Sequence, residues 1–301
     1  MAAEPPVSSS ASIPRRVTRP SLVEWFLTLP PMLWLVLFFL VPTLLVCAIS
    51  FHAADPAGGI QEGWSLDTWR RLMQPSYPAV IWRTVWVSLL ATVVCLALAV
   101  PIAYFIARLK PEYRQWYLLL IILPFWTNFL IRIYAWKTLL HPEGFIKQTL
   151  VAFGMAHENT QLLYNVWAII IVTIYTYLPF AILPLYAAAQ KFDFQLLDAA
   201  RDLGANQLQA FFKVFIPGIN RGLLTALLVT LIPALGSYAI PDIVGGPTSE
   251  LIGNKIVQRV YVDRNLPHAA AISAVLALAV LLPVIIGFIW QSMRRPLTPK
   301  A

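Results

Sequence analysis

The chain has 301 residues, of which 59% are hydrophobic and only 12% are charged. Soluble domains carry about 25% charged residues, so the composition excludes an ordinary soluble fold and indicates a membrane protein with several spans. Long apolar runs lack the alternation of a membrane β-barrel and favour helices. The formal charge of +8 does not indicate nucleic-acid binding, because the basic residues are spread among short loops.

Six apolar stretches are long enough to cross a bilayer, which takes about 20 helical residues. They predict an all-α membrane protein with six spans, at 29–51, 80–107, 116–139, 162–189, 219–240 and 268–290. The predicted organisation is an N-terminal tail (1–28), a six-helix domain (29–292) and a C-terminal tail (293–301). No soluble domain and no internal repeat is evident.

The first span is longer than a signal-peptide core of about 7–15 residues, so we expect it to be retained; cleavage after Ala48 or Ser50 stays open. Pro42 is expected to kink it. The loop that follows, 52–79, predicts a short helix from Ser65 to Leu72, which presents Trp69 and Leu72 to the membrane surface. Segments 141–161 and 241–267 are predicted loops.

Loop charge predicts the orientation. With the N-terminus inside, thirteen Lys and Arg residues lie in inner segments and eight lie in outer ones. The positive-inside rule therefore favours cytoplasmic N- and C-termini. This orientation places the polar segment 193–217, between the fourth and fifth spans, in the cytoplasm.

That segment predicts two short helices joined at Gly204, which we expect in the left-handed conformation. Leu196, Leu197, Ala200 and Leu203 share one face of the first helix, and Asp198, Arg201 and Asp202 lie largely on the other. Asn206 is expected to cap the second helix, which exposes Phe211, Phe212 and Phe215. The pattern fits a handle for a partner protein and a passive connecting loop equally well.

The same segment resembles the cytoplasmic signature of ABC-importer permeases, Glu-Ala-Ala, three residues, Gly, nine residues, Ile-x-Leu-Pro. The matching positions are Asp198, Ala199, Ala200, Gly204, Val214, Ile216 and Pro217. Asp198, Val214 and Ile216 replace the usual Glu, Ile and Leu. The resemblance implies a type I ABC-importer permease fold with a cytoplasmic coupling helix pair, which docks onto a separate ATPase subunit.

Catalytic patterns are missing from the sequence. It contains no GxxxxGK[ST] run, no GxSxG and no HExxH or other metal-ligand spacing. Cys47 and Cys95 lie in hydrophobic runs, where cysteine acts as a small apolar residue. We therefore expect no enzymatic activity, no metal and no cofactor in this chain, and ATP hydrolysis in another subunit.

A few polar and aromatic residues are candidates for a solute pathway. Asp242 follows the fifth span, which Pro233 and Gly236 loosen, and helices interrupted by Gly and Pro often carry binding groups. Tyr175, Tyr177 and Tyr238 offer aromatic faces to a cation. Helix packing, an interfacial aromatic belt and a loop position for Asp242 are alternative interpretations.

Arg132 lies inside the third span. It is interpreted as an interfacial anchor beside Tyr134 and Trp136, or as the partner of Asp242 or Glu143 in an ion pair. Gly218 and Gly222 form a small-xxx-small pattern that allows two helices to approach closely.

Further stretches resemble the spermidine/putrescine branch of these permeases. They are 101–108, 123–136, 235–247 and 251–254, and the second contains Trp126, which we add to the pathway candidates. One departure is Ser237, where some relatives carry Glu.

The resemblance implies a permease subunit of an ATP-driven importer in the bacterial inner membrane, with polyamines as the expected solute. The implied partners are a second permease, an ATPase dimer and a periplasmic solute-binding protein. The alternatives are a permease for another small organic solute, of amino-acid or opine type, and a self-sufficient secondary transporter. A secondary transporter usually needs ionisable residues deep in the membrane, and this chain has almost none.

Overall fold

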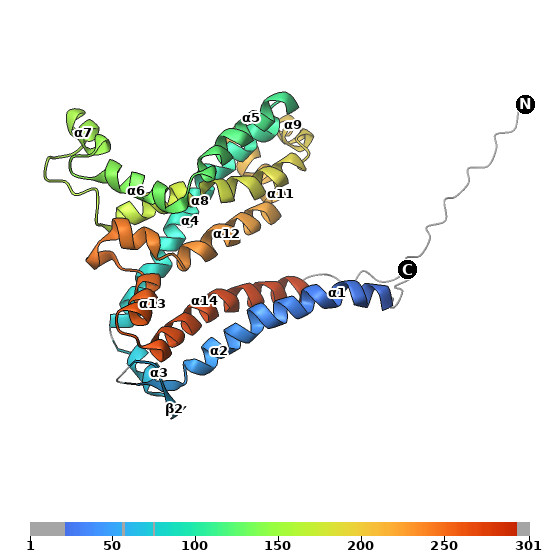
Figure 1. Ribbon diagram of the computed structural model, residues 1–301. Coiled ribbons are helices and arrows are strands. Elements are labelled where there is room, and N and C mark those ends of the chain that lie inside the picture. The colour runs from blue at the N-terminus through green and yellow to red at the C-terminus, as the bar shows by residue number, and fades with distance from the viewer. Residues whose placement is uncertain (1–21, 56–57, 75, 294–301) are drawn as a thin grey trace, which may run out of the picture. The chain divides into compact units, whose positions relative to one another are not determined.

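The computed structural model describes residues 22–55, 58–74 and 76–293 (Figure 1). The predicted N-terminal tail lies outside these residues up to residue 21, and the predicted C-terminal tail lies outside them beyond Met293. The chain divides into two compact units, of which the first ends at Val46 and the second begins at Cys47.

The first predicted span is one helical stretch with an irregular turn inside it. Helix α1 (Leu22–Leu35) continues through a π-helical turn, η1 (Val36–Leu40), into α2 (Val41–Ile49). The Val41 N–H donates to the Val36 carbonyl, five residues back. The helix therefore departs from regular α geometry just before Pro42, which has no N–H to donate.

Three long helices form the centre of the second unit: α4 (Ser76–Arg108), α8 (Val166–Gln190) and α12 (Asn220–Leu235), which pack against one another (Figure 1). Small residues line the contact and are almost fully buried: Ala99, Ala103, Ala181, Ala189 and Ala226. A Cβ atom on Gly222 would lie 2.3 Å from the Cβ of Ala188. The close approach predicted from the Gly218–Gly222 pattern is thus present, between α12 and α8.

Three helices are long and apolar enough to cross a membrane among the described residues, or up to five if each bent pair counts as one span. The prediction was six. The sixth predicted span corresponds to α14 (Leu266–Met293), in which the apolar stretch that can be assessed, Leu266–Leu282, is shorter. The other differences arise at breaks in the third and fifth predicted spans.

The third predicted span is not one straight helix. It consists of α5 (Pro111–Ile122), the 3₁₀ turn η2 (Leu123–Trp126) and α6 (Phe129–Leu140), followed by α7 (Phe145–Ala152), and it bends by 89°. Thr127 is extended, and the Asn128 side chain caps α6 by accepting from the Leu130 N–H at 2.8 Å. Pro124 and Asn128 thus end one helix and start another inside an apolar run. Helix α7 occupies part of the predicted loop 141–161.

The fifth predicted span ends early, at Leu235 in place of Ile240. Gly236–Tyr238 is irregular, and the chain continues through the π-helical turn η4 (Pro241–Gly245) and the 3₁₀ turn η5 (Pro247–Ser249) to α13 (Ile252–Tyr261). The predicted loop 241–267 is therefore largely helical. Helix α14 packs against α13.

The loop after the first span contains a hairpin that the sequence did not predict. Strands β1 (His52–Ala54) and β2 (Ile60–Trp64) pair antiparallel, with His52 opposite Trp64, and α3 (Asp67–Leu72) follows. The predicted role of Ser65 is present in part, since its hydroxyl accepts from the Asp67 N–H at 3.2 Å.

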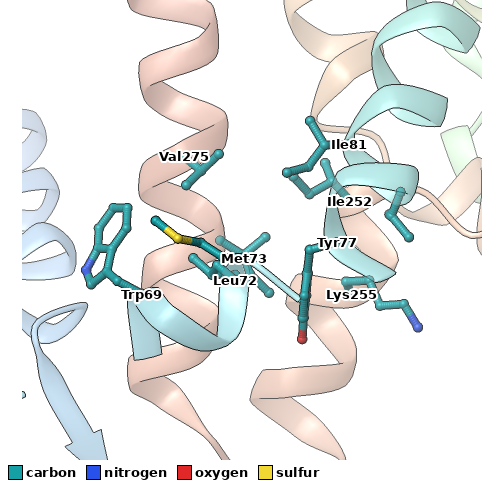
Figure 2. A pocket seen from close by; sticks show the side chains of 10 residues that line it. Trp69, Leu72, Met73, Tyr77, Ile81, Ile252, Lys255 and Val275 are labelled. Carbon is teal, nitrogen blue, oxygen red and sulfur yellow. The ribbon is translucent and has the colours of Figure 1, made fainter. Parts of the chain in front are cut away.

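Trp69 and Leu72 on α3 were predicted to lie on the membrane surface, but they turn toward neighbouring helices. Both line an apolar pocket of about 230 Å³, together with Tyr77 and Ile81 of α4, Ile252 of α13 and Val275 of α14 (Figure 2). Leu72 also packs on the buried cluster formed by Tyr77, Ile252 and Ile272. Burial against α14, distant in the sequence, decides where this short helix faces.

Candidate functional site

The elbow, residues 193–217, is built as predicted at its turn. Helix α9 (Gln195–Asp202) ends where Gly204 takes a φ of +88°, a conformation that costs glycine little. The next helix, α10 (Gln207–Ala210), begins with a capping box, in which the Asn206 side chain accepts from the Gln209 N–H and the Gln209 side chain accepts from the Asn206 N–H. The predictions for Gly204 and Asn206 are confirmed.

A π-helical turn, η3 (Phe211–Phe215), and α11 (Ile216–Gly218) complete the elbow and lead into α12. The prediction that Phe215 is exposed was wrong, because its side chain is fully buried. Its ring lies 4.8 Å from the ring of Tyr104 on α4, 5.2 Å from Phe192 and 5.4 Å from Phe211. These four aromatic residues, the aromatic cluster, attach the elbow to α4.

The elbow also carries exposed apolar side chains. Leu203 is 89% exposed, and the others are Leu196, Leu208 and Phe212. Of the face predicted for α9, Leu197 alone is buried, at 3% exposure. Next to the exposed leucines, Arg201 forms an ion pair with Asp198 at 3.2 Å. We name these four exposed side chains the apolar face of the elbow.

The signature residues lie on different sides of the elbow. Asp198, Ala199, Gly204 and Pro217 are exposed, whereas Ala200, Val214 and Ile216 are half-buried and pack on the core that contains Phe215. The segment therefore combines an accessible side with one fixed to the helical bundle.

Polar contacts support the start of the break after α12, residues 236–242, and Ala239–Pro241 within it is buried. The Tyr177 hydroxyl on α8 donates to the Pro233 carbonyl at 3.3 Å. From α13, the Asn254 amide donates to the Tyr238 carbonyl at 3.3 Å and to the Asp242 carboxylate at 3.5 Å. A Cβ atom on Gly253 would lie 2.5 Å from the Ser237 carbonyl oxygen.

The predicted pathway residues are only partly brought together. Tyr238 and Asp242 lie one turn apart and exposed, joined by the Asp242 N–H to Tyr238 carbonyl bond of 3.0 Å. Tyr177 reaches the same break from α8. Tyr175 instead packs its ring 5.3 Å from that of Trp136 on α6. Trp126 lies on η2 and is 76% exposed.

Arg132 forms no ion pair with Asp242 or Glu143, all three of which the structure describes. Its guanidinium carbon lies 4.4 Å from the Phe125 ring centroid, which is a cation–π contact across the bend between η2 and α6. Sequence analysis missed Asn254 and Gly253 as residues that support the break. Their position after a Leu-Ile pair gave no local signal of that role.

Comparison with known proteins places the chain in a family. Residues 99–296 match the family model described as "Binding-protein-dependent transport system inner membrane component". The spermidine/putrescine transport system permease protein PotB of Haemophilus influenzae is 38% identical, covering 89% of this chain and 92% of that protein. PotB of Escherichia coli K12 is 37% identical, covering 87% of this chain and 94% of that protein.

A solved structure shows the same fold. The crystal structure of a bacterial ABC transporter that imports the acidic polysaccharide alginate contains a chain that aligns with a TM-score of 0.70 at 19% identity, covering 92% of this chain and 96% of that one. At this identity the likeness concerns the fold alone. By family model, relatives and fold together, the chain belongs to the binding-protein-dependent transport system inner membrane components, the permeases of ABC importers.

Proposed function

We propose that this permease imports polyamines such as spermidine and putrescine, forms half of the pathway with a second permease, and is driven by an ATPase dimer. A periplasmic solute-binding protein delivers the solute. The proposed topology has six spans within residues 29–292 of a bacterial inner membrane, with the tails 1–28 and 293–301 in the cytoplasm. This count treats α14, the bent stretch from α5 to α6, and α12 after the elbow each as one span.

The apolar face of the elbow is the observation that carries the coupling role. Leu196, Leu203, Leu208 and Phe212 are exposed on a segment whose other side is locked by the aromatic cluster. Apolar side chains presented from a rigid support are typical of a protein interface. An ATPase groove that covers this face can move α4 and α12, because Phe215 contacts Tyr104 and α11 leads directly into α12.

Replacing Gly204 by Val tests the coupling role. The φ of +88° disfavours any side chain there, while no atom lies within 4 Å of the added Cβ, so the change alters the turn without a clash. We expect uptake to fall while ATP hydrolysis by the complex persists. Gly154→Val is the matched control, since Gly154 has a φ of +69° and equally open surroundings. Full uptake by Gly204→Val would contradict the coupling role.

The polyamine assignment rests on the named substrates of the relatives and on the chemistry at the break after α12. Asp242 supplies a carboxylate and Tyr238 an exposed aromatic ring, which suit a polyammonium solute. Radiolabelled spermidine uptake by vesicles with the whole complex should fall in Asp242→Asn. Ser237, where some relatives carry Glu, favours the second candidate, another small organic solute. If the complex takes up another small organic solute and excess polyamine does not reduce that uptake, the second candidate is selected.

A further inference from the structure

A cleft lies beside the elbow, between the end of α8 and the start of α12. Its volume is about 570 Å³. Small residues shape its floor, because Gly218 lies against Phe192 and Gly222 lies against Ala188, so close that a Cβ on either would clash. Ala187 adds no bulk. Small residues therefore bring the two helices close together at the floor of the cleft.

Two cations line this cleft without an acidic partner. Lys191 follows the last residue of α8, and Arg221 is the second residue of α12. In the part of the chain that the structure describes, neither forms an ion pair. The nearby Asp193 is engaged elsewhere, since its carboxylate accepts from the Gln195 N–H at 3.0 Å.

The position of Arg221 increases the positive potential further. The first turn of a helix carries the positive end of the helix dipole, where anions are favoured and cations are not. Helix α12 has 16 residues and starts after a 72° bend, so its dipole begins at this cleft. Asn220 and Thr225 add polar side chains to the lining. An anion in the cleft would compensate both cations and the helix end together.

We propose that the cleft binds a phosphate group, carried by an anionic phospholipid or by a small soluble phosphate compound. Phosphate is favoured over a lone carboxylate because its several oxygens can accept from Lys191, Arg221 and Asn220 together. The site lies where α8 meets α12, directly beside the elbow, so its occupancy would stiffen the joint. The proposal does not depend on which solute is imported.

Phosphate binding can be tested on the purified complex with a Lys191→Gln/Arg221→Gln double variant. We expect native mass spectrometry to show phosphatidylglycerol retained by the unaltered complex, with about 30-fold weaker retention in the double variant. Lys110→Gln is the control, because Lys110 is an exposed cation in the charged turn before α5, outside the cleft. The proposal would be overturned if the double variant and the control retained phosphatidylglycerol equally and inorganic phosphate did not stabilise the unaltered complex.

A second experiment distinguishes a lipid headgroup from a soluble compound as the source of the phosphate. Thermal stability is measured in phosphatidylcholine nanodiscs, with and without phosphatidylglycerol or inorganic phosphate. Stabilisation by the lipid alone assigns a headgroup site, and stabilisation by inorganic phosphate assigns a soluble ligand. If the double variant fails to assemble, Lys191→Gln alone is used, because Lys191 is exposed. Loss of permease pairing irrespective of lipid would show a protein interface instead and overturn the proposal.

Discussion

The elbow and the break after α12 are both interruptions of helical structure, but they are held by different forces. At the elbow, the buried Phe215 ring contacts aromatic neighbours from α4 and from the segment before α9. At the start of the break, Gly236–Tyr238 is exposed or half-buried, and single hydrogen bonds from Tyr177 and Asn254 hold the backbone around it. Apolar packing resists displacement in every direction, whereas a few hydrogen bonds can exchange with water at little net cost. The elbow is therefore suited to transmit movement, and the exposed start of the break is suited to yield.

The largest expected effect comes from removing the centre of the aromatic cluster. Phe215→Ala should lower the free energy of unfolding by about 3–5 kcal/mol, because it leaves a cavity among rings that cannot close around it. Thermal unfolding of the purified protein measures this loss. Phe212→Ala, three residues earlier and 61% exposed, should change it by no more than about 0.5 kcal/mol. Equal effects would show that the elbow is not locked by packing.

An intermediate effect is expected at the support of the break. Gly253→Ala places a methyl group 2.5 Å from the Ser237 carbonyl oxygen, a backbone atom that cannot rotate away. We expect the free energy of unfolding to fall by about 1–3 kcal/mol, which is typical of overpacking. We also expect the relative loss of uptake to exceed the relative loss of thermal stability. Gly236→Ala is the control, since its new methyl would meet only one atom, at 4.0 Å. If the two variants behave alike, the close approach of Gly253 to the Ser237 carbonyl does not support the break.

The smallest effect is expected for one hydrogen bond. Tyr177→Phe removes the donor to the Pro233 carbonyl and should lower the free energy of unfolding by about 0.5–1.5 kcal/mol. Tyr175→Phe is the control, because its ring contact with Trp136 does not involve the hydroxyl. Uptake kinetics and thermal unfolding of both variants give the comparison. A loss for Tyr177→Phe as large as that for Phe215→Ala would remove the contrast between elbow and break.

The features that the sequence predicts well depend on local chemistry. Gly204 and Asn206 act within four residues of their own position, so their turn and cap were predictable. Phe215 was placed wrongly because its burial depends on Tyr104, far away in the chain. The bend at Thr127 was missed because the apolar run continues across Pro124 and hides the helix end.

The candidate site shows the same division. The signature of the elbow was recognisable in the sequence, yet which leucines face outward depends on the packing of α9 against the bundle. An ion pair of Arg132 with Asp242 was a reasonable expectation from charge alone. The structure stacks Arg132 on Phe125, because the 89° bend brings that ring beneath the guanidinium.

The bend between α5 and α6 also has a consequence for the lipid around it. Hydrocarbon cannot hydrogen-bond a peptide group, and each group left without a partner in it costs several kcal/mol. Thr127 is extended, so the peptide groups at the bend lack the regular ladder of a helix, and only some of them are served by Pro124 and Asn128. The peptide groups at the bend therefore need water or another protein surface beside them, and lipid tails cannot take that place.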